Sequence, residues 1–284
     1  MIAPLIAAAM LAAAPAPAPP AVQKIRASKI VLVGDSTVAV LGGWGPSFCA
    51  RHVTSFLACV NLARGGRSSG NYRSEGSWEI ALSELRRAPY EQVYVLIQFG
   101  HNDQPGKPGR STDLATEFPA NLKRYVAEAR AAGAVPVLVT PLTRRQFKDG
   151  MLIDDLAPWA EATRRVAAET GTPLVDLHAR STKAIQALGA AAATQFAQRP
   201  PSAEIWAAAA TGTTIEASTG QAPAAPVGHT AASAAANAAA EPMGQARLAF
   251  DYTHVGPEGA DFFAALVVEE LARAVPALRR NLIP

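Results

Sequence analysis

Five short runs of hydrophobic residues, rich in Val, Ile and Leu, stand out along the chain. They occupy positions 29–33, 58–62, 92–99, 134–140 and 173–177. Most are hydrophobic at consecutive positions rather than at alternate ones, which is typical of strands with both faces covered. The pattern therefore predicts five strands of a buried parallel sheet.

Amphipathic helical patterns lie between these runs. In 119–132 apolar residues recur at helical spacing and Gly133 follows as a stop signal, and the segments 156–170 and 258–274 repeat the pattern. Alternating strands and helices predict a three-layer α/β/α architecture with right-handed crossovers. We place it in a single domain, residues 23–284.

The segment 187–246 departs from this alternation. It is dominated by Ala, Pro, Thr and Gly and has few large apolar residues, and it is far longer than an ordinary connection. We expect a solvated, low-complexity insertion with a short helix near 204–210. The alternative is a lid over the functional site.

The first 22 residues have the features of an export signal. An apolar stretch from Leu5 to Ala14 precedes an alanine–proline alternation, although no Lys or Arg occurs before Lys24. This predicts a signal peptide with an atypical basic region, and a secreted or periplasmic protein; a disordered cytosolic leader is the alternative. The apolar stretch is too short to span a bilayer, so we expect no membrane partner.

Composition and charge argue against some classes of binding partner and cofactor. The 284 residues are 49% hydrophobic and carry a net charge of +3, without a dense run of Lys and Arg, so we expect no nucleic-acid binding. Cys49 and Cys59 are the only cysteines, and the sequence leaves their pairing open. Neither lies in a Cys/His cluster, and we expect neither a metal nor an organic cofactor.

The stretch VLVGDSTVAV, residues 31–40, runs a hydrophobic strand directly into a Gly-Asp-Ser sequence. Gly, Asp and Ser are ordinary turn formers, which is one interpretation. The other is that the strand holds the Ser36 hydroxyl at its carboxyl end, where open α/β sheets bind their ligands.

A carboxylate and an imidazole occur three residues apart near the end of the sequence, as Asp251 and His254. In a loop or a first helical turn, the carboxylate can then hold the imidazole in the tautomer that leaves Nε2 free as a base. Acyl transfer by a serine needs a nucleophile, such a base and such a carboxylate. We therefore predict Ser36, Asp251 and His254 as catalytic residues.

Two further strand ends offer hydrogen-bond donors. Gly65 and Gly66 follow the second predicted strand, and His101 and Asn102 follow the third. Backbone N–H groups at a glycine and an asparagine amide can stabilise developing negative charge. Taken singly, each is more simply a turn residue, but together with the triad they indicate an oxyanion site. His101 is expected to be structural.

A rival nucleophile is Ser68. Residues 66–70, GRSSG, match the G-x-S-x-G elbow of α/β-hydrolases. That elbow needs a strand running directly into the serine, and here residues 64–67 intervene, with no apolar helix immediately after. We therefore favour Ser36.

Four blocks in order, GDST, NLARGGRSS, QFGHND and DYTH, resemble those of the SGNH (GDSL) hydrolases. The additional sequences GGWG and EGSW are similar to the rhamnogalacturonan acetylesterase branch of that superfamily. The resemblance covers residues 29–183 and 249–275 and implies a flavodoxin-like five-stranded parallel sheet. The long insertion before Asp251 departs from the compact pattern of the family.

The same resemblance implies roles for individual residues. Ser36 is the nucleophile, with Asp251 and His254 as its partners. The oxyanion hole is formed by the backbone N–H groups of Ser36 and Gly66 and by the Asn102 side chain. Because Gly65 precedes Gly66, which of the two glycines donates stays open.

Four residues near the expected rim are candidate substrate contacts. Trp44 and Trp78 are candidates for stacking on sugar faces, and Arg67 and Arg73 for binding uronate carboxylates. Packing of the two tryptophans and plain solvation of the two arginines are the alternatives. The remaining histidines, His52, His178 and His229, are expected to be incidental.

The sequence as a whole predicts a secreted serine esterase that removes acetyl groups from a polysaccharide of the pectic, rhamnogalacturonan type. An alternative is a lipase, arylesterase or thioesterase on the same scaffold, because function depends on the site and not on the fold. A non-catalytic carbohydrate-binding relative is a third reading. A binding module has no use for an aligned base, which argues against it.

Overall fold

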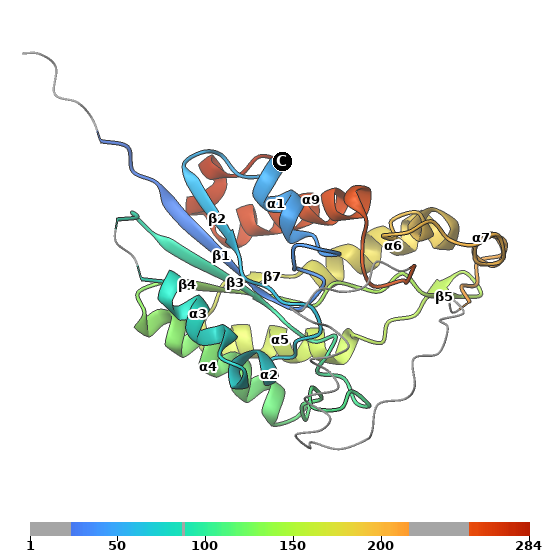
Figure 1. Cartoon of the computed structure of the whole chain (residues 1–284), viewed down its shortest axis with the longest axis horizontal. Coiled ribbons are helices and arrows are strands. Elements are labelled where there is room, and N and C mark those ends of the chain that lie inside the picture. Colours follow the sequence, from blue (N-terminus) through green and yellow to red (C-terminus); the bar gives the residue numbers. More distant parts are fainter. Residues whose placement is uncertain (1–23, 87–88, 216–249) are drawn as a thin grey trace, which may run out of the picture.

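A five-stranded parallel sheet forms the centre of the molecule in the computed structural model, which describes residues 24–86, 89–215 and 250–284 (Figure 1). The strands are β1 (Ser28–Gly34), β2 (Leu57–Asn61), β3 (Val93–Gln98), β4 (Val135–Val139) and β7 (Leu174–Val175). Their order across the sheet is β2-β1-β3-β4-β7, which is the flavodoxin-like order. All five predicted strands and the predicted fold class are confirmed.

Helices cover both faces of the sheet (Figure 1). One layer contains α1 (Gly45–Arg51), α6 (Leu177–Thr194) and α9 (Pro257–Ala274), followed by the 3-10 helix η2 (Pro276–Asn281). The other contains α2 (Asn71–Ser74), α3 (Ser77–Glu84), α4 (Glu117–Ala131) and α5 (Ala157–Thr170). The three helices predicted from apolar spacing correspond to α4, α5 and α9. No helix within the described ranges is long and apolar enough to cross a membrane.

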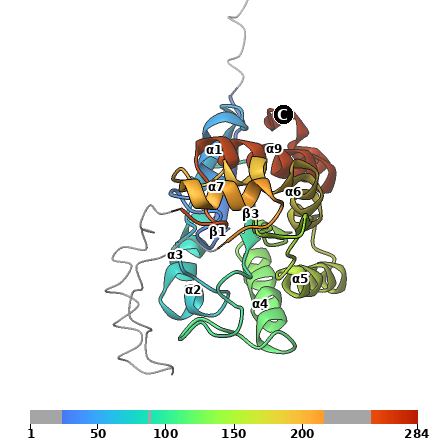
Figure 2. The ribbon, with the colours of Figure 1, turned by 90° about the vertical axis from the view of Figure 1, so that its right-hand side faces the viewer.

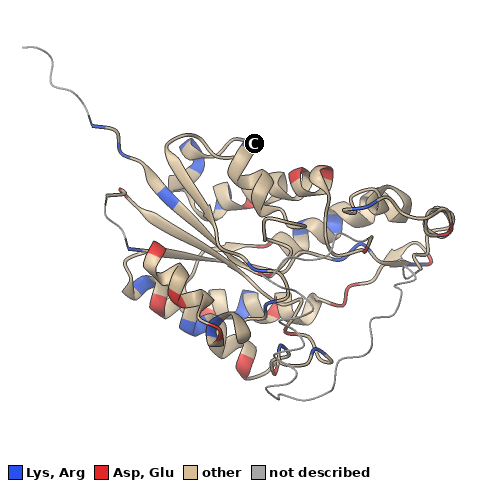
Figure 3. Cartoon of the chain, in the orientation of Figure 1, with Lys and Arg blue, Asp and Glu red and all other residues tan. Residues whose placement is uncertain are grey.

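Strand β1 shows why its sequence is hydrophobic at consecutive positions. Ile30 and Leu32 belong to the apolar cluster on the side of α1 and α9, whereas Val31 and Val33 belong to the cluster on the side of α3 and α4. All four side chains are fully buried, because both faces of the sheet are covered. Charged residues lie mainly on the surrounding helices and loops (Figure 3).

A disulfide joins Cys49 in α1 to Cys59 in β2. The sequence left the pairing of these two cysteines open, and the structure decides it. The bond links a helix of one layer to the edge strand that this helix covers.

The described part of the segment 187–246 contains more helix than we expected. Helix α6 continues through residue 194 and buries Ala190 and Ala193, and α7 (Ala203–Ala210) buries Ile205 and Ala209. Alanine side chains are small enough to pack at close helix contacts, so an alanine-rich composition does not by itself mean solvation. The helix predicted near 204–210 is confirmed as α7.

Two expectations lie outside the described residues. The signal peptide was placed in residues 1–22, and the larger part of the low-complexity segment, with its lid alternative, lies in residues 216–246. Both therefore stay predictions.

The carboxyl ends of the strands face the viewer in Figure 2, and α7 lies in front of them. The hairpin of β5 (Phe147–Lys148) and β6 (Met151–Leu152) projects from the same edge (Figure 1). The segment that leads into α7 pairs with the chain just before α9, because the Gly256 N–H donates to the Phe196 carbonyl at 2.8 Å. This pairing brings the late part of the sequence to the edge where β1 and β3 end.

Candidate active site

Ser36 lies in a tight turn at the carboxyl end of β1. Asp35 Oδ1 accepts hydrogen bonds from the Thr37 backbone N–H (2.8 Å) and the Thr37 hydroxyl (2.7 Å). Gln98 at the end of β3 donates its amide to the Thr37 hydroxyl at 2.6 Å. A side chain at Gly34 would place its Cβ 2.7 Å from the Gln98 carbonyl, so glycine is needed where the two strands approach. The turn therefore has a fixed shape, and Ser36 lies at its tip.

Asp251 and His254 form the pair that their spacing predicts. The His254 Nδ1 lies 2.7 Å from Asp251 Oδ2. The other carboxylate oxygen accepts the backbone N–H groups of Thr253 (2.7 Å) and His254 (2.6 Å). Burial opposes ionisation of Asp251, but these hydrogen bonds and the charge of His254 hold its pKa below the ordinary value. The carboxylate is therefore ionised at neutral pH and holds the imidazole with Nε2 available.

The loop after Ser36 and the loop that carries His254 are joined through their backbones. The Val255 N–H donates to the Gly42 carbonyl at 2.9 Å. A Cβ at Gly42 would lie 3.2 Å from the His254 Cβ, so the two loops are in contact. Within the described residues, no hydrogen bond joins the Ser36 hydroxyl to His254 Nε2. The structure thus places the predicted base beside the loop of the predicted nucleophile.

The predicted oxyanion donors lie at the ends of the two strands next to β1. Gly66 follows β2 with a φ of 74°, a conformation that favours glycine. Asn102 follows β3, and its amide donates to the Arg67 carbonyl at 3.1 Å. Arg110 donates to the Asn102 Oδ1 at 3.5 Å, which orients the amide. Which of the two adjacent glycines donates to an oxyanion stays open.

His101 lies below this edge and is buried with Asp35, with 3.3 Å between His101 Nδ1 and Asp35 Oδ2. Burial lowers the pKa of His101, and the negative charge of Asp35 acts in the opposite direction. Asp103, also buried, accepts hydrogen bonds from Ser69 and Thr112, yet burial raises its pKa to about 6. These groups support the strand end from inside, in line with a structural role for His101.

The surroundings of Ser68 argue against it as the nucleophile. Its side chain is fully buried, and its hydroxyl donates to the Asn71 side chain at 3.0 Å. The Ser68 backbone N–H donates to the same oxygen at 2.6 Å. The G-x-S-x-G match therefore marks a turn before α2 that is held by hydrogen bonds between Ser68 and Asn71.

The tryptophans predicted to stack on sugars are wrong as substrate contacts, because Trp44 and Trp78 are both fully buried. The Trp44 indole N–H donates to Gln98 at 3.0 Å, under the Ser36 turn. The Trp78 indole N–H donates to Glu128, and its ring packs edge-on against Tyr125. Both indoles satisfy interior polar groups and leave no face for a ligand.

The two arginines predicted to bind substrate carboxylates are also engaged elsewhere. Arg73 pairs with Glu128 at 2.7 Å, and its guanidinium lies over the ring of Tyr125. Arg67 pairs with Glu75 at 3.0 Å and donates to the Gly65 carbonyl at 2.8 Å. Their charges are neutralised within the chain, so neither is a free anchor for an anion.

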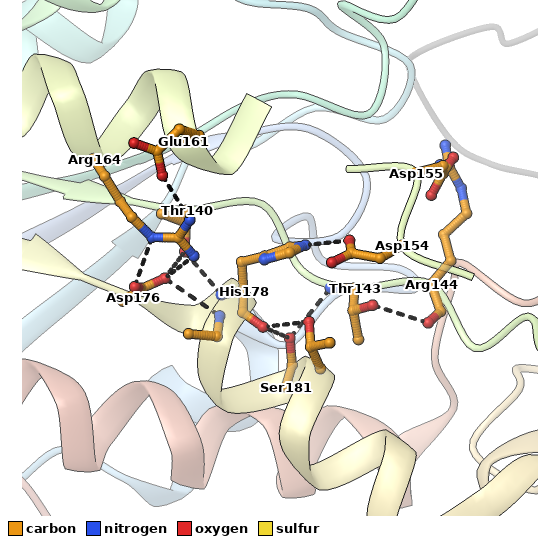
Figure 4. A network of polar contacts seen from close by, with 12 residues as sticks. Thr140, Thr143, Arg144, Asp154, Asp155, Glu161, Arg164, Asp176, His178 and Ser181 are labelled. Carbon is orange, nitrogen blue, oxygen red and sulfur yellow. Dashed lines mark hydrogen bonds and ion pairs between the residues drawn. The ribbon is translucent and has the colours of Figure 1, made fainter. Parts of the chain in front are cut away.

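Two histidines called incidental have partners after all. His178 Nε2 lies 2.8 Å from Asp154 Oδ1, in a polar network that also contains Thr143 and Ser181 (Figure 4). His52 Nδ1 lies 2.9 Å from the Ile283 carbonyl. These contacts join segments far apart in the sequence, so no local pattern indicates them. His229 lies outside the described residues.

Arg145 is the residue that sequence reasoning missed. Its guanidinium is fully buried and donates to the carbonyls of Asp251 (3.1 Å), Thr253 (3.2 Å) and His254 (2.7 Å). Its backbone N–H donates to the Tyr252 carbonyl at 2.9 Å. Burial lowers the pKa of Arg145 to about 10, so it stays charged at neutral pH. One side chain thus fixes the backbone of the loop that carries the Asp–His pair.

Comparison with known proteins identifies the class. The model of the GDSL-like lipase/acylhydrolase family matches residues 32–193. The crystal structure of the Bacillus subtilis protein YxiM superposes with a TM-score of 0.57 at 21% identity, covering 88% of this chain and 58% of that one, which supports the shared fold. The chain therefore belongs to the GDSL-like lipase/acylhydrolase family, the SGNH hydrolases, and is a carboxylic ester hydrolase.

Two curated relatives indicate the branch of this family to which the chain belongs. The chain is 35% identical over 162 residues to the probable rhamnogalacturonan acetylesterase YesY of Bacillus subtilis, covering 55% of this chain and 72% of the relative. It is 33% identical to the rhamnogalacturonan acetylesterase RhgT of the same organism, covering 57% and 69%. The chain thus lies in the rhamnogalacturonan acetylesterase-like branch, as the sequence blocks indicated.

Proposed function

We propose that this protein is an exported serine esterase that removes acetyl groups from an acidic, pectin-type polysaccharide. One observation carries the proposal: the ionised Asp251 holds His254 at 2.7 Å, on a loop bonded to the one that follows Ser36. An imidazole held with Nε2 free beside a serine at a strand end is the arrangement that acyl transfer needs.

The reaction has two halves. His254 Nε2 takes the Ser36 proton as the hydroxyl oxygen attacks the ester carbonyl, and the resulting oxyanion is stabilised by the Asn102 amide and the backbone N–H groups of Ser36 and Gly66. The imidazolium then gives its proton to the departing sugar oxygen as the C–O bond breaks. Water, deprotonated by His254, attacks the acetyl-serine, and acetate leaves as Ser36 regains its proton.

The names of the relatives support a rhamnogalacturonan-type substrate, because YesY and RhgT are called rhamnogalacturonan acetylesterases. A longer acyl group is the second candidate. A groove of about 440 Å³, lined largely by apolar groups that include Val40, Leu41 and Pro46, borders Gly42 and Val255. It lies beside the catalytic loop and offers room for an apolar chain, as in a lipase.

Export is supported by two features. The apolar stretch and the alanine–proline alternation in residues 1–22 are typical of a signal peptide. The Cys49–Cys59 disulfide is of the kind that persists in oxidising compartments. Fractionation of cells that produce the full chain, with N-terminal sequencing of the product, tests this. Uncleaved protein in the cytosol would contradict it.

The test of the activity is a pair of matched serine variants. Ser36→Ala should abolish hydrolysis of p-nitrophenyl acetate, whereas Ser68→Ala should keep most of it with a lower melting temperature. Wild-type kcat/KM should also fall from acetate to octanoate esters; a rise would favour the lipase alternative, since each buried methylene is worth about 0.8 kcal/mol. Retained activity in Ser36→Ala would refute the mechanism.

A further inference from the structure

Three cationic side chains lie along one side of the candidate site: Lys107 and Arg110, in the loop after β3, and Arg144, in the segment after β4. Arg110 donates to the Asn102 side chain at 3.5 Å, and Arg144 donates through Nε to the Thr253 hydroxyl at 3.2 Å. The cations therefore extend from the predicted oxyanion donor to the loop of the Asp–His pair. We call these three residues the cation cluster.

Hydrogen bonds hold the loop of the cation cluster in one shape. The Ser111 hydroxyl donates to the Gln104 carbonyl (2.7 Å) and accepts the Lys107 backbone N–H (3.0 Å). At the base of the loop, the Thr112 backbone N–H donates to the Asp103 carbonyl at 3.0 Å. Gln104 in turn accepts from Arg144 at 2.8 Å. These hydrogen bonds fix the shape of the loop that carries Lys107 and Arg110.

The members of the cation cluster differ in their partners. Arg144 is paired with Asp155, and the two lie together in Figure 4. The Lys107 ammonium group has no hydrogen-bond or ion-pair partner among the described residues, although the side chain is half-buried. Burial and the charges of Arg144 and Arg110 lower the pKa of Lys107, against the carboxylates of Asp155 and Asp35. Repulsion between neighbouring cations makes the charged form of Lys107 less favourable, and a bound anion would relieve it.

Arg67 and Arg73 are different, because each is paired with a glutamate of the chain itself. An incoming anion would have to displace Glu75 or Glu128. At the cation cluster it would find an ammonium group with no protein carboxylate in contact. An anion can therefore reach the Lys107 ammonium group without displacing a carboxylate that contacts it, which is not so at Arg67 or Arg73.

We infer that the cation cluster binds a sugar carboxylate, that of a uronate residue next to the acetylated sugar, and so selects acidic polysaccharides. This rests on the proposed esterase function and names the feature of the substrate that is recognised. The carboxylate contacts the Lys107 ammonium group while the acetyl carbonyl oxygen faces Asn102. The contact lies away from the reacting ester, and its binding energy is used to orient that ester for the reaction.

The first experiment compares two polymers. We measure kcat/KM on acetylated rhamnogalacturonan and on acetylated neutral xylan, and take the ratio of acidic to neutral for wild type and variants. Lys107→Met should lower the ratio about tenfold or more, since a charge-assisted hydrogen bond is lost. Lys107→Glu should lower it further, and Lys107→Arg should restore most of it. The matched control is Arg280→Met, which removes an exposed cation that pairs with Glu91, next to the start of β3.

The second experiment uses a small probe. Galacturonate should inhibit hydrolysis of p-nitrophenyl acetate competitively, galactose should not, and Lys107→Met should weaken the inhibition. Inhibition by inorganic sulfate as strong as that by galacturonate would show a general anion site and overturn the inference. A wild-type ratio near one, or a ratio unchanged in Lys107→Met and Lys107→Glu, would overturn it as well.

These outcomes are distinct from failure of the proposed function. If the esterase assignment is wrong, the wild type fails on both polymers and on p-nitrophenyl acetate. If only the cation cluster is misassigned, the wild type deacetylates both polymers and the ratio does not depend on Lys107. Melting temperatures of all variants show whether each one folds.

Discussion

Two of the His–Asp pairs in the described part of the chain have nearly equal contact distances but different surroundings. His254 Nδ1 lies 2.7 Å from Asp251, and His178 Nε2 lies 2.8 Å from Asp154. The His254 side chain is 22% exposed, whereas that of His178 is 5% exposed. The contact between the partners is thus the same, and the environment is not.

The two pairs differ in what the neighbouring serine does. Ser181, beside His178, is fully buried, donates its hydroxyl to the His178 carbonyl and accepts the Thr143 N–H. Ser36 lies at a strand end, and its hydroxyl has no hydrogen-bond partner among the described residues. A serine acts as a nucleophile when its hydroxyl proton can pass to a base, and a buried hydrogen bond to a backbone carbonyl opposes this. The comparison shows that the His–Asp distance alone does not make a pair catalytic. The exposure of the histidine and the state of the neighbouring serine hydroxyl decide it.

The largest effect should come from removing each imidazole in turn. His254→Ala should lower kcat/KM on p-nitrophenyl acetate by about 10⁴-fold or more, because the general base is lost. His178→Ala should keep kcat/KM within about threefold but lower the free energy of unfolding by about 1–3 kcal/mol, since Asp154 loses its buried partner. Steady-state kinetics and urea unfolding measure both. Comparable losses of activity would erase the distinction between the pairs.

The next effect concerns the two carboxylates. Asp251→Asn should lower kcat by about 10³–10⁴-fold, because an amide no longer holds the imidazole in the required tautomer. Asp154→Asn is the matched control and should change kcat little. Stopped assays with p-nitrophenyl acetate measure kcat for both variants. A small effect at Asp251 would mean that His254 needs no carboxylate.

A smaller effect is expected at Arg145. Arg145→Lys keeps the positive charge, but a lysine cannot span three carbonyls as the planar guanidinium does. We expect kcat to fall about 10–100-fold with a smaller change in KM, because the loop of the base is misplaced. Arg164→Lys, at the bridge to Asp176, should leave both constants near wild type. If KM rises and kcat does not change, Arg145 supports substrate binding and not the Asp–His pair.

The smallest expected effect is on stability and not on catalysis, and it concerns the buried Asp103 carboxyl group behind the site. The pKa of Asp103 is raised to about 6 from 3.8, so between these values the folded protein keeps a proton that the unfolded chain has lost. The contribution of Asp103 to stability therefore falls as the pH rises from about 4 to about 6, by at most about 3 kcal/mol. Asp251 and Asp35, with lowered pKa values, act below pH 4 in the opposite direction.

Asp103→Asn isolates this contribution. Unfolding by urea at pH 4.5 and at pH 7 should show a smaller difference between the two pH values in the variant than in the wild type. An identical difference in both proteins would show that Asp103 is ionised across this range. Asp113, which is exposed, provides the control as Asp113→Asn.

Local sequence patterns predicted the features that depend on local geometry. Consecutive hydrophobic positions set the strands, because a strand covered on both faces needs them. The spacing of Asp251 and His254 was sufficient for their pairing, since three residues of loop bring the two side chains together. The turn after β1 was recognisable for the same reason, because Asp35 and Thr37 bond to each other across one residue.

Some side chains are positioned by contacts with residues far away in the sequence, among them Trp78, Arg73 and Arg145. Trp78 and Arg73 both meet Glu128, 50 and 55 residues away, and the acceptors of Arg145 lie 106 to 109 residues away. An exposed tryptophan and a buried one look alike in a sequence. The substrate contacts expected at these positions failed because burial depends on what the fold places opposite a side chain.

By itself, then, the sequence determined the sheet, the chemistry of the Ser36 turn and the Asp251–His254 pair, because all three follow from periodicity or from neighbours a few residues away. Only the tertiary structure decided which cations are neutralised and which face the site. Arg67 and Lys107 carry the same charge on similar loops, but the fold sets Glu75 beside the first and leaves the second without a carboxylate in contact. Coulomb interactions depend on distance in space, and that distance is fixed only when the chain is folded.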